Sequence, residues 1–201
     1  MKYGLYYDYK NIGDVLIILF DATAQSDWEE EYDDVVCLYS GDRLIGIYIY
    51  NISKIFKIKA KGYIPLINKK IHEVINTILL NAKLEPLEFL KHSGYVVARI
   101  NEIEEHPTNK ELKVCKLNVG DETLQVVSGA ENIRENLLCV CALPYTFLPK
   151  RRQVIPTTIE GVDSFGLICS AKDLQIKGAS EENKVLELDE TYSVGIDFWY
   201  Y

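Results

Sequence analysis

The residues best suited to chemistry lie in the stretch TTIEGVDSFGLICSAKDL, from Thr157 to Leu174. Ser170 is followed three residues later by Asp173, which is the spacing of a helix-starting capping box with Asp in place of Glu. Gly161 and Gly166 bracket the polar turn before it and let the chain bend sharply. A bent strand that ends in a capped helical turn offers N–H groups and a hydroxyl to a phosphate or a sugar oxygen. Taken alone, the pattern favours a structural turn that needs no ligand.

The charge balance of the chain is acidic, with 22 Lys and Arg against 30 Asp and Glu among 201 residues and a net charge of −8. This balance argues against broad, non-specific attraction to nucleic acid, which normally requires a basic surface. From Ser93 onward there are 11 basic and 17 acidic residues, so the second half is the more acidic one. Any contact with phosphate must therefore come from local clusters of cations.

Several classes of protein are not supported by the sequence. No apolar run approaches the roughly 20 residues that span a bilayer, and no signal-like segment opens the chain, so we expect a cytoplasmic protein without a membrane partner. The five cysteines form no CxxC pair and stand at no metal-ligand spacing with the three histidines, which predicts free thiols, no metal and no cofactor. No P-loop or nucleophile elbow is present, so we expect no catalysis.

The first half of the chain predicts a small α+β domain over residues 1–90. Two hairpins are expected, one from KYGLYYDY and VLIILF and one from DDVVCLYS and RLIGIYIYNIS around a Gly41-Asp42 turn. Asp21 to Asp34 is acidic and polar and predicts an exposed loop. Lys57 to Tyr63 predicts a strand with its lysines on one face, either a solvated edge, which is favoured, or a strip that contacts phosphate. From Asn68 to Ala82 the apolar residues fall at helical spacing, which predicts an amphipathic helix over the sheet.

The second half, residues 91–201, predicts mainly β structure. Apolar segments with strand alternation are separated by glycine turns, and the clearest are YVVARINEIEE, LKVCKLNVG, LQVVS and LLCVCAL. About five strands in roughly 80 residues suit a small closed barrel. Composition and pattern leave an oligonucleotide-binding (OB) barrel, an SH3-like barrel and a small sandwich open.

Four blocks of this half resemble one known family. The blocks are VVARINEIEEHPTNKELKVCKLNVG, QVVSGAENI, IEGVDSFGLICSAKDL and VLELDETYSVGIDFWYY. Their order and spacing are similar to the tRNA-binding domain found in the bacterial phenylalanyl-tRNA synthetase β chain and at the end of many methionyl-tRNA synthetases. With the N-terminal GDVLIILF and GIYIYNISK segments, the chain resembles the stand-alone YtpR-type members of that family. The resemblance implies an OB-fold barrel after an α+β domain, and a tRNA-binding function in translation.

The resemblance leaves two functions open. The first is non-catalytic binding of tRNA or another structured RNA through the barrel face and its loops. The second is a protein-interaction module that docks to a synthetase or another translation partner with weak or no RNA affinity. Glu160 supports the second, because it stands where family members often carry Arg. Association with a second copy of the chain also stays open.

RNA binding would require cations, backbone donors or polar side chains on the barrel and its loops. The strongest basic patch is the run of three cations at 150–152, beside Phe147 and Tyr145. Lys113 and Lys116 are close in one strand, but their odd separation places them on opposite faces. The candidate RNA-binding residues are Lys150, Arg151, Arg152, Ser170, Lys172, Lys113 and Asn132.

Overall fold

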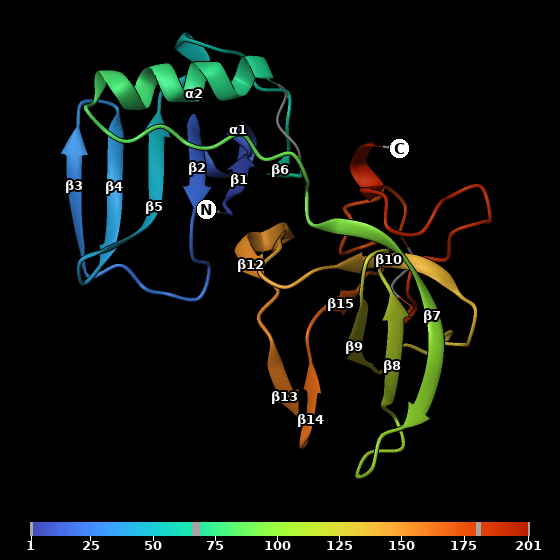
Figure 1. The fold of residues 1–201 in the computed structure, drawn as a ribbon. Coiled ribbons are helices and arrows are strands. Elements are labelled where there is room, and N and C mark those ends of the chain that lie inside the picture. Colours follow the sequence, from blue (N-terminus) through green and yellow to red (C-terminus); the bar gives the residue numbers. More distant parts are fainter. Residues whose placement is uncertain (1, 66–68, 180–181, 201) are drawn as a thin grey trace. The chain divides into compact units, whose positions relative to one another are not determined.

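The computed structural model describes residues 2–65, 69–179 and 182–200, and its ribbon is drawn in Figure 1. The chain divides into two compact units. The N-terminal unit consists of Met1–Lys91 together with Phe147–Gln153, and the barrel unit consists of His92–Thr146 and Val154–Tyr201. The chain therefore returns once from the barrel to the N-terminal unit. No helix in the described ranges is long and apolar enough to cross a membrane.

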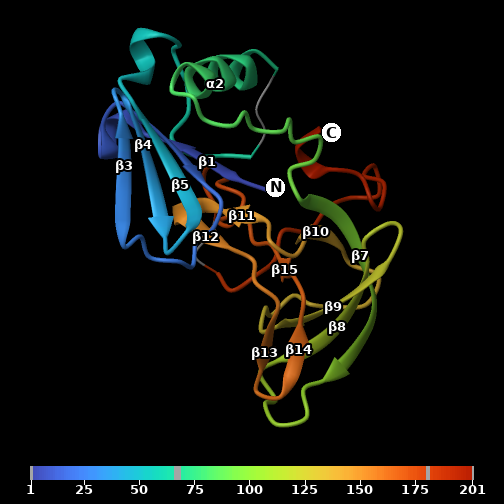
Figure 2. The same ribbon diagram turned by 60° about the vertical axis from the view of Figure 1, so that its left-hand side comes forward.

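The N-terminal unit is built on a six-stranded antiparallel sheet in the order β3-β4-β5-β2-β1-β6. The strands are β1 (Gly4–Tyr7), β2 (Val15–Leu19), β3 (Trp28–Tyr32), β4 (Val35–Ser40), β5 (Arg43–Tyr50) and β6 (Gly62–Ile64). The helices are the single turn α1 (Tyr9–Ile12), the 3-10 turn η1 (Ile52–Lys54) and α2 (Lys69–Asn81). Figure 2 shows α2 lying across one face of this sheet.

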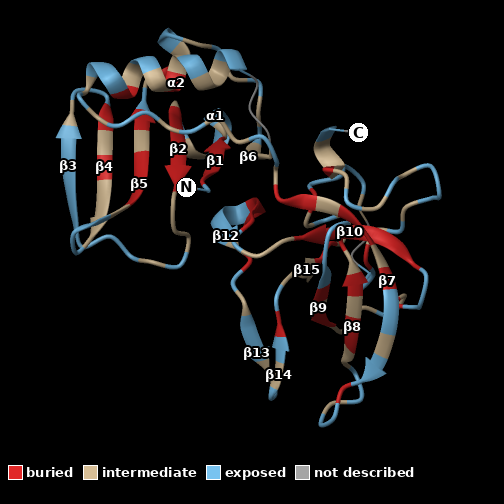
Figure 3. Ribbon diagram, viewed as in Figure 1, coloured by how far each residue is buried: buried red, intermediate tan, exposed pale blue. Residues whose placement is uncertain are grey.

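Both faces of strand β2 are buried, as Figure 3 shows by its continuous red colour. Leu16 and Ile18 join Ile75 and Leu79 of α2 in one core cluster. The alternate residues Val15, Ile17 and Leu19 point to the opposite face and pack in a second cluster with Phe147. Because successive side chains of a strand alternate, a continuous apolar run is what a strand covered on both sides requires.

Phe147 comes from a short hairpin that sequence reasoning assigned to the barrel. Strands β11 (Phe147–Leu148) and β12 (Arg152–Gln153) pair across the 3-10 turn η2 (Pro149–Arg151). Tyr6 Oη donates a hydrogen bond of 2.8 Å to the carbonyl of Leu148, and Ala22 N donates one of 3.4 Å to Gln153 Oε1. The basic run at 150–152 is therefore carried by the N-terminal unit, which differs from the predicted domain of residues 91–201.

Two of the local predictions in this unit were wrong. The acidic segment from Asp21 to Asp34, predicted as a loop, contains the edge strand β3, which pairs along its length with β4. The basic segment from Lys57 to Tyr63, predicted as a strand, has strand geometry only from Gly62. The predicted helix matches α2 within one residue at each end, except that Asn68 lies outside the described residues.

Asp21 is held by hydrogen bonds and by an ion pair with Arg43. Its carboxylate accepts hydrogen bonds from Thr23 Oγ1 at 2.6 Å, from Thr23 N at 2.8 Å and from Ala24 N at 3.1 Å, and it pairs with Arg43 at 2.8 Å. The Thr23 hydroxyl and these further donors lower the pKa of Asp21 to about 2. The loop that follows β2 is thereby held against the start of β5.

We expect Asp21→Asn to destabilise the protein at pH 7 by on the order of 1–2 kcal/mol. The folded pKa of Asp21 lies below its unfolded value, so its contribution is complete above about pH 4 and is lost as the pH falls toward 2. Urea unfolding at pH 7 and pH 3 should show the difference from wild type shrinking at the lower pH. Asp42→Asn, in the exposed β4–β5 turn, is the control. A difference that stays constant with pH would contradict this assignment.

The barrel unit contains a five-stranded antiparallel sheet in the order β15-β10-β7-β8-β9. Its strands are β7 (Tyr95–Glu105), β8 (Lys113–Asn118), β9 (Thr123–Ser128), β10 (Leu138–Ala142) and β15 (Leu167–Ile168). A separate hairpin is formed by β13 (Thr157–Ile159) and β14 (Val162–Ser164), and the 3-10 turn η3 (Phe198–Tyr200) lies near the C-terminus. The four strands predicted from alternation are confirmed.

The two edges of this sheet approach each other, so it is nearly closed into a barrel. Phe165 N donates a 2.9 Å hydrogen bond to the carbonyl of Gln125 in β9, and Val127 N donates one of 3.1 Å to Ser164 Oγ. The interior contains Cys139 and Cys141, both fully buried and both free thiols. Burial raises the pKa of Cys141 to about 12, so this thiol is protonated and behaves as a small apolar side chain.

Candidate nucleic-acid interface

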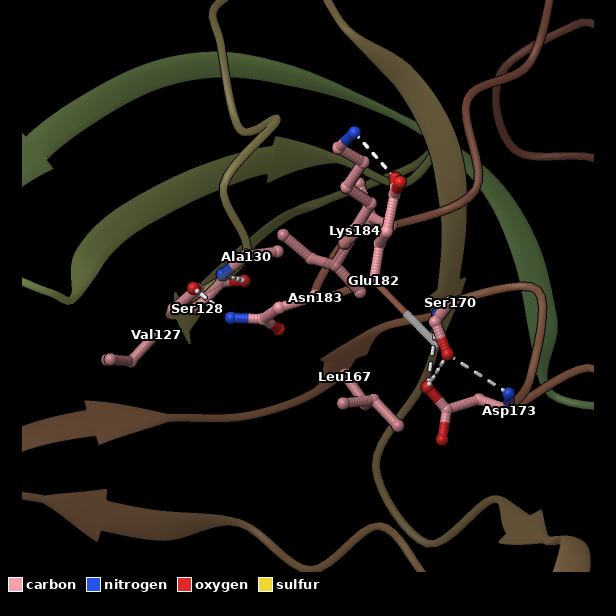
Figure 4. A pocket seen from close by; sticks show the side chains of 12 residues that line it. Val127, Ser128, Ala130, Leu167, Ser170, Asp173, Glu182, Asn183 and Lys184 are labelled. Carbon is pink, nitrogen blue, oxygen red and sulfur yellow. Dashed lines mark hydrogen bonds and ion pairs between the residues drawn. The ribbon is translucent and has the colours of Figure 1, made fainter. Parts of the chain in front are cut away.

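A pocket of about 400 Å³ opens beside Ser170 in the barrel unit. Figure 4 shows Ser170 and Asp173 on one side of it and Ser128 with Asn183 on the other. Ser170 Oγ accepts from Asp173 N at 3.1 Å, and Asp173 Oδ2 accepts from Ser170 N at 3.0 Å and from Ser170 Oγ at 2.7 Å, which confirms the predicted capping box. The residues after it form a turn and no regular helix. The cap is satisfied within the chain, so Ser170 offers only its remaining lone pair to a ligand.

The cation that lines this pocket is neutralised by a neighbour. Lys184 Nζ lies 2.6 Å from Glu182 Oε2, and the pair is drawn in Figure 4. The lysine lowers the pKa of Glu182, and the acid raises the pKa of Lys184. Lys172, a predicted site residue, is exposed in the turn after Ser170 but is not among the residues that line the pocket. The pocket therefore offers hydrogen-bonding groups rather than a net positive charge.

Asn132, also predicted as an RNA contact, serves as a clamp inside the barrel unit. Its Oδ1 accepts from Val185 N at 2.9 Å, and its Nδ2 donates to Val185 O at 3.0 Å and to Glu187 Oε1 at 2.8 Å. Both amide hydrogens are thus engaged. The side chain holds the segment around Val185 against the loop before β10.

The two lysines of β8 lie on opposite faces, as their spacing predicts. Lys113 Nζ donates to the carbonyl of Ile133 at 3.2 Å. Lys116 Nζ lies 2.8 Å from Glu102 and 3.4 Å from Glu104 on the neighbouring strand β7. One lysine is used to hold a loop and the other to pair with acids.

Two arginines of the barrel unit make bidentate pairs that sequence reasoning missed. Arg99 binds both carboxylate oxygens of Glu190 at 3.0 and 2.7 Å, and Arg134 binds both of Glu187 at 2.8 and 2.7 Å. Hydrogen bonds from Arg134 and Asn132 lower the pKa of Glu187 to about 2. The partners are 91 and 53 residues apart, so no local signal marks them. Planar guanidinium groups that face carboxylates in this way are not available to phosphate until the acid is displaced.

Glu160 is engaged within its hairpin tip. Glu160 and Gly161 form the two-residue turn between β13 and β14, with φ angles of 45° and 92°. The Glu160 carboxylate accepts a 3.1 Å hydrogen bond from Asn109 Nδ2. His106 bonds the Ile159 carbonyl at 3.0 Å through its Nε2. This acid therefore fastens the hairpin to the loop after β7.

The division into units separates the charges of the chain. The barrel unit contains 8 Lys and Arg against 17 Asp and Glu, and the N-terminal unit contains 14 against 13. The hairpin enlarges this difference, because it brings its three cations, Lys150, Arg151 and Arg152, to the N-terminal unit, where all three are exposed. The N-terminal unit is thus nearly neutral and carries the exposed basic run at 150–152, whereas the barrel unit is strongly acidic.

Comparisons with known proteins point in one direction. The family described as "Putative tRNA binding domain" matches residues 95–197. The "Putative tRNA-binding protein YtpR" of Bacillus subtilis (strain 168) is 32% identical over 196 residues, which is 96% of this chain and 98% of that protein. The phenylalanine–tRNA ligase β subunit of Wolbachia sp. subsp. Brugia malayi is 41% identical over 111 residues, 54% of this chain but only 14% of that subunit.

A solved structure is also similar in part. The crystal structure of a MetRS-related protein from Pyrococcus horikoshii aligns with a TM-score of 0.40 and 20% identity. It covers 52% of this chain and 88% of that protein.

Proposed function

Because the chain belongs to the family of proteins that carry this tRNA-binding domain, we propose that it binds tRNA without catalysing a reaction, through a barrel of the OB-fold type. The observation that carries the proposal is the match of residues 95–197 to the domain, together with similarity to a YtpR protein along nearly the whole length of both chains. Five antiparallel strands that nearly close are consistent with an OB-fold.

The contacts of the barrel with RNA are proposed to be mainly polar. Ser170, Ser128 and Asn183 present hydroxyl and amide groups around one pocket, and Lys172 adds an exposed cation in the adjoining turn. Such groups suit the 2′-hydroxyl and backbone oxygens of RNA better than a general phosphate attraction does. Lys113 and Asn132 support this surface from within the unit.

A second candidate function is docking to a protein of the translation machinery. It is favoured by the ion pairs that occupy Arg99, Arg134 and Lys116 and by the excess of acids on the barrel unit. A barrel whose arginines are held by carboxylates has weak electrostatic attraction to RNA. The partner in this second function is a protein of the translation machinery or a second copy of the chain.

A mobility-shift titration of tRNA with the full chain separates the two functions. We expect binding at 50 mM salt that weakens at 200 mM, because each phosphate contact contributes roughly 0.9 to the salt slope or less. The absence of binding at 50 mM, together with recovery of a stoichiometric protein partner, would replace RNA binding by docking.

Releasing the pocket lysine is expected to strengthen tRNA binding. In Glu182→Gln the 2.6 Å ion partner of Lys184 is lost, and only the weaker attraction of Glu131 and Glu187 then competes with a phosphate for the lysine. We expect about two- to fivefold tighter binding at 50 mM salt and a salt slope steeper by up to about one. Glu111→Gln, an exposed acid of the same unit, makes the same change of net charge and is the matched control. Equal effects of the two variants would show that only net charge matters and that the pocket does not contact RNA.

A further inference from the structure

A second pocket lies on the N-terminal unit, on the sheet face away from α2. We propose that it binds one unpaired nucleotide of RNA, with the base against Tyr48 and the phosphate at Arg151. The inference rests on the proposed function in that its ligand is RNA, but it uses none of the barrel residues. It would give the N-terminal unit a direct part in recognition.

The pocket has a volume of about 370 Å³, within the range of roughly 300–1,000 Å³ typical of small-molecule sites. Leu19, Leu38 and Ile45 contribute apolar lining, and Tyr48 contributes an aromatic ring. Gln25, Ser26 and Arg151 bring polar groups. An apolar lining with a few polar groups is suited to a flat heteroaromatic ligand whose edge carries donors and acceptors.

The aromatic side chains lie on the face that α2 leaves open. On β5, Ile47 packs in the core under α2. Because side chains alternate along a strand, Tyr48 and Tyr50 both lie on the other face of the sheet. Tyr48 is half-buried beside the cluster of Phe147, and Tyr50 is 41% exposed. Their rings are 6.4 Å apart in an edge-on arrangement. Open sheet faces that carry aromatic rings are a recurring platform for stacking single-stranded bases.

The cation is supplied by the tip of the β11–β12 hairpin. Lys150 and Arg151 have φ angles of 60° and 56°, a left-handed conformation that residues with a side chain rarely adopt. The root of the hairpin is fixed by burial of Phe147 and by the Tyr6 to Leu148 hydrogen bond. A strained basic tip on a rigid root holds Arg151 at the pocket that Tyr48 also lines.

Acidic residues near this pocket limit the direction from which a phosphate can approach Arg151. Asp21 lines the same pocket, but its carboxylate is engaged by Thr23, Ala24 and Arg43. Glu29 is the register partner of Leu38 and therefore faces the same side of the sheet. Glu29 repels phosphate on the β3 side, so the RNA backbone is expected to run along the hairpin side. The charge pattern thus favours one orientation, with the base toward the sheet and the phosphate at Arg151.

The test uses the full chain, a fluorescein-labelled single-stranded RNA decamer and tRNA, with anisotropy measured at 50 and 200 mM salt. Tyr48→Ala should weaken decamer binding roughly 5- to 150-fold, the range for loss of one stacked base. Tyr48→Phe keeps the stacking ring and should stay within about twofold of wild type. Because Tyr48 also packs on the Phe147 cluster, urea unfolding must show that the alanine variant is folded.

Arg151→Gln provides a second measurement that does not disturb the core, since Arg151 is exposed. It should lower the salt slope of decamer binding by about one unit. A folded Tyr48→Ala variant with unchanged affinity, or an unchanged slope in Arg151→Gln, would overturn the inference. If wild type binds the decamer in a Tyr48-dependent way but does not bind tRNA, the proposed function fails and the pocket stands. If tRNA binds and neither variant changes the affinity or the salt slope of decamer binding, the proposed function stands and the pocket is not an RNA site.

Discussion

Replacing Gly195 by alanine is expected to destabilise the barrel unit by roughly 3–5 kcal/mol. Gly195 has a φ of +87°, and a Cβ there would lie 2.8 Å from the Cα of Gly120. Gly120 has a φ of +112°, and its own added Cβ would lie 2.8 Å from the Cα of Gly195. Both obstacles are backbone, so no side chain can rotate away. Gly195 N also donates a 2.8 Å hydrogen bond to Val97 O in β7, which ties the crossing to the sheet.

Urea unfolding of Gly195→Ala beside Gly161→Ala separates backbone contact from conformation. Gly161 has a similar φ of +92°, but a Cβ there meets nothing within 4 Å. Its alanine variant should therefore lose only about 1–2 kcal/mol, the cost of a left-handed residue. Equal losses in the two variants would mean that conformation alone explains the effect. The close approach of Gly195 to Gly120 would then contribute nothing to the loss in free energy of unfolding.

Much of the barrel could be predicted because its strands carry their signal locally. The alternation in 95–105, 113–118 and 123–128 follows the two-residue period of a strand with one buried face. Strand β3 carries no such signal, since Glu29, Glu30 and Glu31 are all exposed. It is a strand because β4 supplies partners for its backbone groups. The strand conformation of β3 depends on pairing with β4, so it could not be predicted from the residues of β3 alone.

The candidate site was less predictable because it depends on contacts between distant residues. The capping box at Ser170 was found from a spacing of three residues. The anchoring of the basic hairpin depends on Tyr6 and Leu148, which are 142 residues apart. The pairing of Arg99 with Glu190 joins residues that are 91 positions apart. Sequence reasoning therefore identified the cations but could not assign them to a unit or recognise which were already paired.

Reversing the charges of the hairpin tip is expected to produce the largest change in RNA binding. In the triple variant Lys150→Glu, Arg151→Glu and Arg152→Glu, three potential phosphate contacts become repulsive. The tRNA affinity at 50 mM salt should fall about 100-fold or more, and the salt slope should fall by about three units. Folding should be retained, because the substituted side chains are exposed while Phe147 and Leu148 at the root stay buried.

The control is the matched triple variant Lys57→Glu, Lys59→Glu and Lys61→Glu in the same unit. It changes the net charge of the chain by the same amount, but these lysines lie in the irregular segment before β6. If the hairpin forms part of the RNA surface, this control should lose far less affinity and keep most of its salt slope. Equal losses would mean that binding follows total charge, whereas unchanged binding in the hairpin variant would remove 150–152 from the RNA surface. The two triple variants change the net charge equally but at different places in the chain. Comparing their tRNA affinities therefore distinguishes a localised binding site from a general electrostatic attraction.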